Sequence, residues 1–133
     1  MSVHSRIQNN AQEIVRLHQQ MHAAVARRGD GPSEQALWQA ACHEFHARYE
    51  ELSFPGGPRT ARDQLRAGDP VALEYALAFL EIRPYFFRSG YMFKDYIRVL
   101  RTCPLSDTQR DRYNVVKATY DVYRDQRKRR TRP

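Results

Sequence analysis

The sequence predicts an all-α fold, a single compact domain of five to six helices packed as an irregular bundle or as stacked helix pairs. Three observations favour this fold. Apolar residues recur at steps of three and four along most of the chain, no segment shows the alternation of a β-strand, and Gly or Pro interrupts the chain at short intervals. A chain of 133 residues that is 41% hydrophobic is long enough to bury a core as one domain, which we expect to cover residues 1–126.

The first two helices are expected to form a pair. The first begins after Ser5 and ends near Arg28, where Gly29 supplies a left-handed stop. Its apolar face comprises Ile7, Ile14, Leu17, Met21 and Val25. After the turn at residues 30–32, Ser33 is expected to cap the second helix. The apolar stripe of that helix comprises Leu37, Trp38, Ala41, Phe45, Tyr49 and Leu52.

The middle of the chain combines a loop, a short helix and a central helix. The segment FPGGP at residues 54–58 cannot be helical, because proline lacks a donor and glycine is conformationally loose. A short helix is expected at 60–67. Asp69 followed by Pro70 is a strong start signal for a helix over 70–82. Because that helix is apolar almost all round, we expect it to be buried between the others.

The last third is expected to hold an aromatic corner and two more helices. Pro84 ends the central helix, and a further helix is expected at 91–101. Ser106 and Gln109 fit the capping-box pattern at the start of the last helix. That helix carries Tyr113, Val116, Tyr120 and Tyr123 on one side. Residues 127–130 are all basic, so we expect the helix to fray into a C-terminal extension over 127–133.

Charge is distributed unevenly along the chain. Residues 1–82 hold eight basic and ten acidic residues, a net charge of −2, whereas residues 83–133 hold fourteen basic and five acidic residues, a net charge of +9. This asymmetry indicates a basic face that meets an acidic partner, although a solvated surface would carry similar charge. The predicted face comprises Lys94, Arg98, Arg101, Arg110, Lys117 and Arg124.

Histidines offer the candidate metal ligands. His18 and His22 lie four apart on one helix face, but no third ligand is indicated, so we favour a packing or boundary role. His43, His46 and Glu50 share another face, although the two histidines are three apart and therefore do not form the HExxH zinc motif. This second set is expected to face solvent and is a weak candidate for a metal or hydrolase site.

No arrangement of residues specifies a reaction. Cys42 and Cys103 are expected to be free thiols, and neither has an indicated activating base. The chain has no nucleophile elbow, phosphate-binding loop or dinucleotide fingerprint. We therefore predict no catalytic residue and no cofactor, and favour a role other than that of an enzyme.

The most distinctive stretch runs from residue 79 to residue 91 and interleaves five aromatic residues with two arginines. Such a stretch is able to stack nucleic-acid bases, but we favour a structural corner of the core formed by Glu81, Arg83, Arg88 and Tyr91. Here Arg83 and Arg88 are expected to pair with Glu74 or Glu81, or to bond to carbonyls at the helix end.

Together, FPGG at 54–57 and RPYFFRSGY at 83–91 resemble motifs of an uncharacterised group of small bacterial all-helical proteins. The resemblance covers about residues 50–110. It implies a bacterial origin and a helical fold, and no catalytic residue. The expected helix pairs are also similar to HEAT-type repeats, an analogy of fold alone.

These patterns favour a non-catalytic interaction protein, an adaptor or inhibitor that binds an acidic protein partner through its basic C-terminal face. Immunity-type proteins that neutralise bacterial toxins are one setting for such a chain. The alternative is a nucleic-acid-binding protein that uses the basic helices 91–101 and 107–128. With no signal peptide and no apolar run of membrane-spanning length, a cytoplasmic location is expected, with no membrane or small-molecule partner.

Overall fold

A computed structural model of the chain describes residues 2–131 and confirms the all-α prediction, with no strand among those residues. The six α-helices and one short 3-10 helix are α1 (Val3–Val25), α2 (Pro32–Ser53), η1 (Pro58–Thr60), α3 (Ala61–Arg66), α4 (Pro70–Ile82), α5 (Ser89–Leu100) and α6 (Asp107–Thr131). Among residues 2–131, none of the helices combines the length and the apolar character that a membrane span requires.

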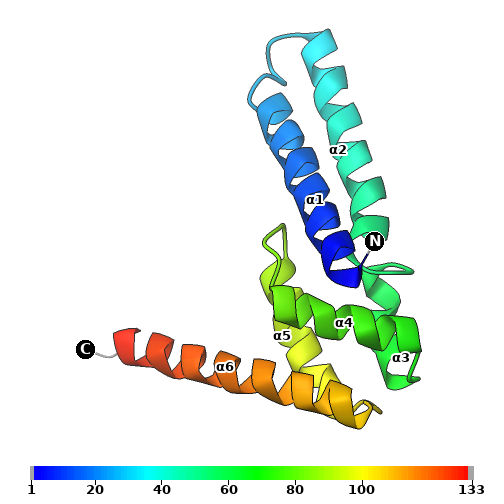
Figure 1. The fold of residues 1–133 in the computed structure, drawn as a ribbon. Helices are drawn as coiled ribbons and strands as arrows, with labels where there is room; N and C mark the ends of the chain where they lie inside the picture. Colours follow the sequence, from blue (N-terminus) through cyan, green and yellow to red (C-terminus); the bar gives the residue numbers. More distant parts are fainter. Residues whose placement is uncertain (1, 132–133) are drawn as a thin grey trace.

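The helices form two arms that meet at a corner (Figure 1). The antiparallel pair α1 and α2 makes one arm, and α6 projects from the base of the molecule as the other. The short helices α3, α4 and α5 form the base between them. The side of the molecule between the α1–α2 arm and the free half of α6 is therefore concave.

Helix α4 is the central helix, as predicted, and packs against α1, α3, α5 and α6. The Asp69 side chain accepts a hydrogen bond from the Ala72 N–H at 2.9 Å, and Pro70 occupies the first helical position. Every residue from Tyr75 to Leu80 is buried. The burial is not uniform, because Val71 in the first turn is exposed whereas Ala78 is fully buried.

The α1–α2 arm is well packed only near the base. Ile7, Ile14 and Leu17 are buried on α1, and Ala41 and Phe45 are buried on α2. Beyond these residues, the outer half of the arm has only the partner helix to pack against (Figure 1). Leu37, which the apolar stripe placed in the core, is therefore 66% exposed.

Both helices of this arm begin earlier than predicted. Ser2, rather than Ser5, caps α1, because its hydroxyl accepts the Ser5 N–H at 3.1 Å. Helix α2 begins at Pro32 with Gly31 as its cap residue, and no side chain caps it. Proline at the first helical position replaces the expected cap of Ser33, since proline has no N–H to satisfy.

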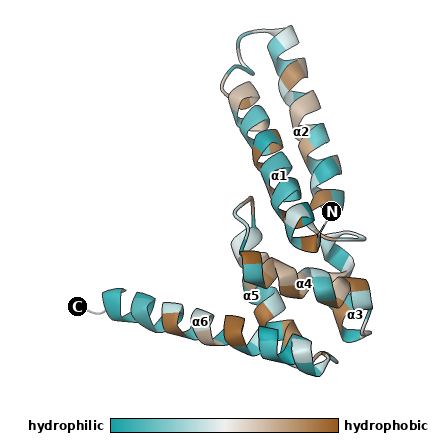
Figure 2. Ribbon diagram, in the orientation of Figure 1, coloured by the Kyte–Doolittle hydropathy of each residue, from teal (hydrophilic) through white to brown (hydrophobic). Residues whose placement is uncertain are grey.

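Helix α6 starts where the capping box predicted. The Ser106 hydroxyl accepts the Gln109 N–H at 3.1 Å, and the Gln109 side chain accepts the Ser106 N–H at 3.1 Å. Tyr113 is buried and donates to the Ile97 carbonyl at 2.6 Å, which fixes α6 against α5. Further along, α6 leaves the base and becomes predominantly hydrophilic (Figure 2).

The expected fraying at residues 127–130 is wrong, because α6 continues as a helix to Thr131. Basic side chains in the last turn face the negative end of the helix dipole, and this favourable interaction opposes their mutual repulsion. The basic segment is therefore part of the second arm. The last two residues of the predicted 127–133 extension lie outside the described residues.

Candidate functional site

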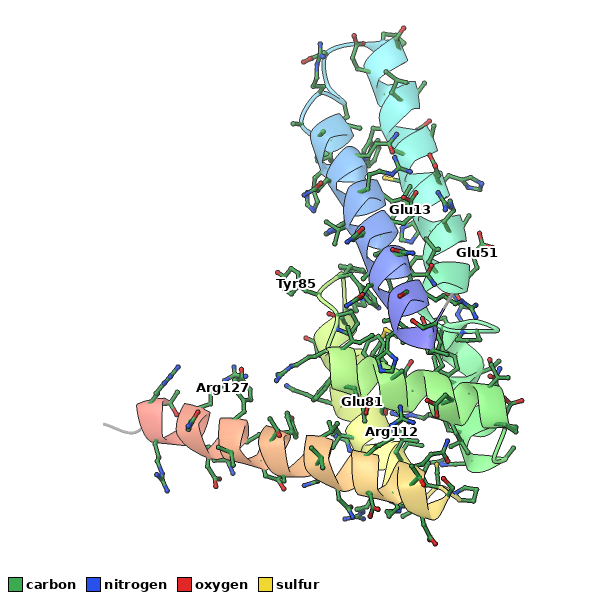
Figure 3. All side chains as sticks on the ribbon, in the orientation of Figure 1. Glu13, Glu51, Glu81, Tyr85, Arg112 and Arg127 are labelled. Atoms are coloured by element: carbon green, nitrogen blue, oxygen red, sulfur yellow. The ribbon has the colours of Figure 1, made fainter. Side chains whose placement is uncertain are left out.

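An open groove of about 1080 Å³ occupies the concave corner between the two arms. We call it the corner groove. Its floor is the segment from Arg83 to Lys94, and its walls are one face of α1 and the outer half of α6. Figure 3 shows Tyr85 on the loop at this corner and Arg127 on the side of α6 that faces it.

Six basic side chains line the corner groove, and no Asp or Glu is among the described residues that line it. The six are Arg83, Arg88, Lys94, Arg124, Arg127 and Lys128. None of them takes part in an ion pair formed within residues 2–131, whereas Arg48, Arg62 and Arg112 elsewhere are paired with carboxylates. The groove therefore concentrates positive charge that no carboxylate of residues 2–131 neutralises by pairing.

Aromatic rings contact three of these guanidinium groups, and the simplest case is Arg124, which lies 5.7 Å from the Tyr120 centroid. Arg83 lies between two rings, 4.6 Å from the centroid of Phe93 and 4.7 Å from that of Tyr123. Arg88 lies 5.0 Å from the Phe87 centroid. Such cation–π contacts fix the position of the charge but leave it uncompensated, so it is available to an anionic ligand.

The backbone at Arg83 and Arg88 is unusual. These are the two non-glycine residues with positive φ among the described residues, at 52° and 67°. Arg83 ends α4 and Arg88 precedes α5, positions where glycine would adopt the left-handed conformation without a steric penalty. Backbone strain of this kind clusters at functional sites. The chain accepts the strain at two residues that both place a cation in the groove.

Helical register brings the cations of α6 to the groove. Tyr113, Tyr120 and Arg127 are each seven residues apart and therefore lie on one face of the helix. Tyr113 and Tyr120 are buried against the base, and Phe93 packs edge-on against Tyr120 at 5.3 Å. Beyond the base, the same face becomes basic and lines the groove at Arg124, Arg127 and Lys128.

Two tyrosine rings in the groove are free. Tyr85 is 90% exposed and Tyr91 is 77% exposed. Neither makes a ring or cation contact with another described residue, unlike Phe87 and Tyr123, each of which carries an arginine. Tyr91, expected in the structural corner, thus points to solvent at the rim of the groove.

The loop that carries Tyr85 is firmly tied to the rest of the molecule. Tyr49 of α2 donates its hydroxyl to the Phe87 carbonyl at 2.9 Å. Ser89 is buried, and its hydroxyl accepts the Phe86 N–H at 3.0 Å. The exposed rings are therefore displayed by a rigid support, which reduces the entropy lost on binding.

His18 forms part of the α1 wall. Its ring packs 5.1 Å from Phe87 and 5.3 Å from Phe45, with His22 edge-on at 4.5 Å. Burial, and then the neighbouring His22, lower the pKa of His18, which favours its neutral imidazole. These ring contacts support a packing role for His18, whereas His22 is exposed beside it at the boundary.

The structure divides the predicted basic face. Lys94 and Arg124 line the corner groove, whereas Arg98 on α5 and Arg101 directly after that helix are exposed outside it. Arg110 donates to the carbonyls of Leu100, Arg101 and Cys103 and so caps the end of α5. Lys117 pairs with Asp121 at 2.7 Å. The predicted residues therefore do not form one continuous surface.

The predicted partners of Arg83 and Arg88 are wrong. Arg112 instead bridges Glu74 at 2.9 Å and Glu81 at 2.6 Å, joining α6 to α4 (Figure 3). Arg112, with a smaller contribution from His4, lowers the pKa of Glu81. Because Arg112 binds both glutamates, neither pairs with Arg83. The Arg83 side chain instead stacks between its two rings, and its charge remains unpaired in the groove.

The candidate metal ligands are dispersed. His43 and His46 are exposed on α2, and Glu50 lies 3.5 Å from Arg59. Within residues 2–131, no three His, Cys, Asp or Glu side chains lie close enough together to hold a metal ion. Both thiols are free; burial raises the pKa of Cys103, which makes it a poor nucleophile.

Two features of the groove are missed from the sequence: the exposure of Tyr85, which the corner interpretation places in the core, and the position of Arg127 and Lys128, which are expected in a frayed extension. Outside the groove, the sequence indicates no role for Arg112. A signal for the α6 residues was present, since residues 120, 123, 124, 127, 128 and 131 follow steps of three and four.

Comparisons with protein families, curated proteins and solved structures give no match.

Proposed function

We propose that this chain is a non-catalytic interaction module that binds a negatively charged macromolecule in the corner groove. The observation that carries the proposal is the set of six basic side chains that form no ion pair with a described residue, in a groove with no carboxylate among its described lining residues. Bringing six positive charges together is unfavourable unless an anionic partner neutralises them.

The open shape of the corner groove favours a large ligand. The groove is as big as the largest usual small-molecule sites, but it is open along the concave side between the arms. Its cations come from three separate places, namely the corner loop, the start of α5 and the end of α6. A ligand that reaches all three has to extend along the groove.

An acidic protein surface and a nucleic acid both provide an extended row of negative charge. Binding an acidic protein suits an adaptor or inhibitor, such as an immunity-type protein, and requires no catalytic residue of this chain. The positive charge of the groove and its location are compatible with either of these two ligands.

Lys94 and Arg98 provide a matched pair for testing the location. Both are exposed basic residues on α5, one turn apart, but only Lys94 lines the groove. We expect the chain to bind poly-glutamate or an oligonucleotide at about 50 mM salt and to release it as salt rises. Lys94→Glu should weaken binding much more than Arg98→Glu, as measured by fluorescence anisotropy.

Two results would count against the proposal. One is that neither polyanion binds at low salt. The other is an equal loss in the two variants, which would place the interaction outside the groove. Unfolding curves of both variants serve as the control, because two exposed side chains are expected to change stability little.

A further inference from the structure

We infer that the ligand of the corner groove is a single-stranded nucleic acid. This inference rests on the proposed function and narrows the anionic partner to one class. It depends on the two free tyrosine rings, which the charge of the groove alone does not explain.

Cations and rings alternate along the floor of the groove. The order in the chain is Arg83, Tyr85, Arg88, Tyr91 and Lys94, with steps of two or three residues. All five line the groove. A single strand likewise alternates phosphates with bases that are free to stack. Proteins that bind single strands combine a basic groove with aromatic stacking platforms in this way.

The two tyrosine rings are exposed and their faces are available for stacking. Tyr85 and Tyr91 are the most exposed aromatic residues of the described chain, at 90% and 77%. Their faces carry no arginine, whereas Phe87 and Tyr123 are already covered. An exposed ring on a rigid support gains contact area on stacking and loses little entropy.

A duplex and an acidic protein fit the groove less well. In a duplex the base faces are stacked within the helix, so the tyrosine rings cannot reach them. An acidic protein surface supplies carboxylates for the cations but not a regular series of flat faces for the rings. A single strand is therefore expected to use both features of the groove at once.

Binding of a labelled single-stranded oligonucleotide of about 12 nucleotides tests the inference. The same measurement uses the matching duplex and poly-glutamate as alternative ligands. We expect the single strand to bind at least about tenfold more tightly than the duplex. With six phosphate contacts, the logarithm of the binding constant should fall against the logarithm of salt concentration with a slope of about −4.

Substitutions separate stacking from charge. Tyr85→Ala and Tyr91→Ala should each weaken binding of the single strand about 5- to 150-fold, because each removes one stacking platform. Neither should alter the salt slope. Tyr85→Phe keeps the ring and should bind within about twofold of the unmodified chain. Both residues are exposed, so folding of the variants is expected and is checked by circular dichroism.

The outcomes distinguish failure of the inference from failure of the proposed function. If the single strand and the duplex bind equally, and Tyr85→Ala and Tyr91→Ala have no effect, the inference is overturned while charge-driven binding stands. If poly-glutamate binds and the oligonucleotide does not, the inference is overturned in favour of an acidic protein. If no polyanion binds, both are overturned.

Discussion

Replacing Arg88 by glycine should separate stability from binding. Arg88 adopts φ 67° and ψ 10°, the left-handed conformation, immediately before α5. This conformation costs a non-glycine residue about 1–2 kcal/mol, a cost that glycine does not bear. Since Arg88 also presents a groove cation, we attribute the presence of arginine at this position to binding rather than to folding.

The expected change in stability follows from three opposing contributions. Glycine removes about 1–2 kcal/mol of strain, but it loses about 0.5–1 kcal/mol through the greater freedom of the unfolded chain. The cation–π contact with Phe87, at 5.0 Å, contributes about 0.5–1 kcal/mol at an exposed position. Arg88→Gly should therefore unfold within about 1 kcal/mol of the unmodified chain.

Arg88→Ala is the matched control, because it removes the same charge but keeps the strained backbone. It should be less stable than Arg88→Gly by about 0.5–1 kcal/mol, as measured by urea unfolding with a shared m-value. Both variants should show the same shallower salt dependence of polyanion binding, since each lacks one cation. An alanine variant as stable as the glycine variant would refute the claim of strain at this residue.

Three further predictions concern the fold. Leu77→Ala should lower the free energy of unfolding by about 2–5 kcal/mol, because Leu77 is fully buried in α4, whereas Leu37→Ala on the outer arm should change it by less than about 0.5 kcal/mol; urea unfolding compares them. Ser106→Ala removes the cap of α6 and should cost about 1 kcal/mol in the same assay. Arg112 lowers the pKa of Glu81 in the folded chain, so this pair stabilises the fold above the ordinary glutamate pKa and ceases to do so as pH falls through the lowered value. Urea unfolding at pH values between about 5 and 3 should therefore show a smaller loss of stability in Glu81→Gln than in the unmodified chain, and an identical loss would contradict the assignment.

Local signals explain why much of the fold was predictable. Asp69 with Pro70, and Ser106 with Gln109, each specify a helix start within four residues, and the structure has both hydrogen-bonded caps. The composition of residues 70–82 likewise indicated burial without knowledge of the neighbouring helices. Competing local signals caused the errors at the starts of α1 and α2, where Ser2 and Pro32 took the places expected for Ser5 and Ser33.

Features that depend on distant parts of the chain were not predictable in this way. The apolar stripe of α2 gives the direction of Leu37 but not the absence of a third helix beside it. Arg112 meets Glu74 and Glu81 across more than thirty residues of chain, a pairing that only the packing of α6 on α4 decides. By taking both carboxylates, Arg112 leaves Arg83 unpaired.

The candidate groove was only partly predictable for the same reason. Sequence located the positive charge in the last third of the chain and singled out the segment at 79–91. It did not reveal that α6 extends past the base and faces that segment across a concave corner. The register of Arg127 with Tyr113 and Tyr120 was the available signal, but the run of basic residues suggested a frayed end.

A comparison of Arg127→Ala with Arg129→Ala shows whether the anionic ligand binds in the corner groove. Both residues are exposed arginines of the same helix, and only Arg127 lines the corner groove. In a salt titration of oligonucleotide binding, Arg127→Ala should change the slope from about −4 to about −3.5 and weaken binding about fivefold at 50 mM salt, whereas Arg129→Ala should change binding by less than about twofold. Equal weakening by both substitutions would show a general attraction to the basic helix and would contradict a binding site in the groove.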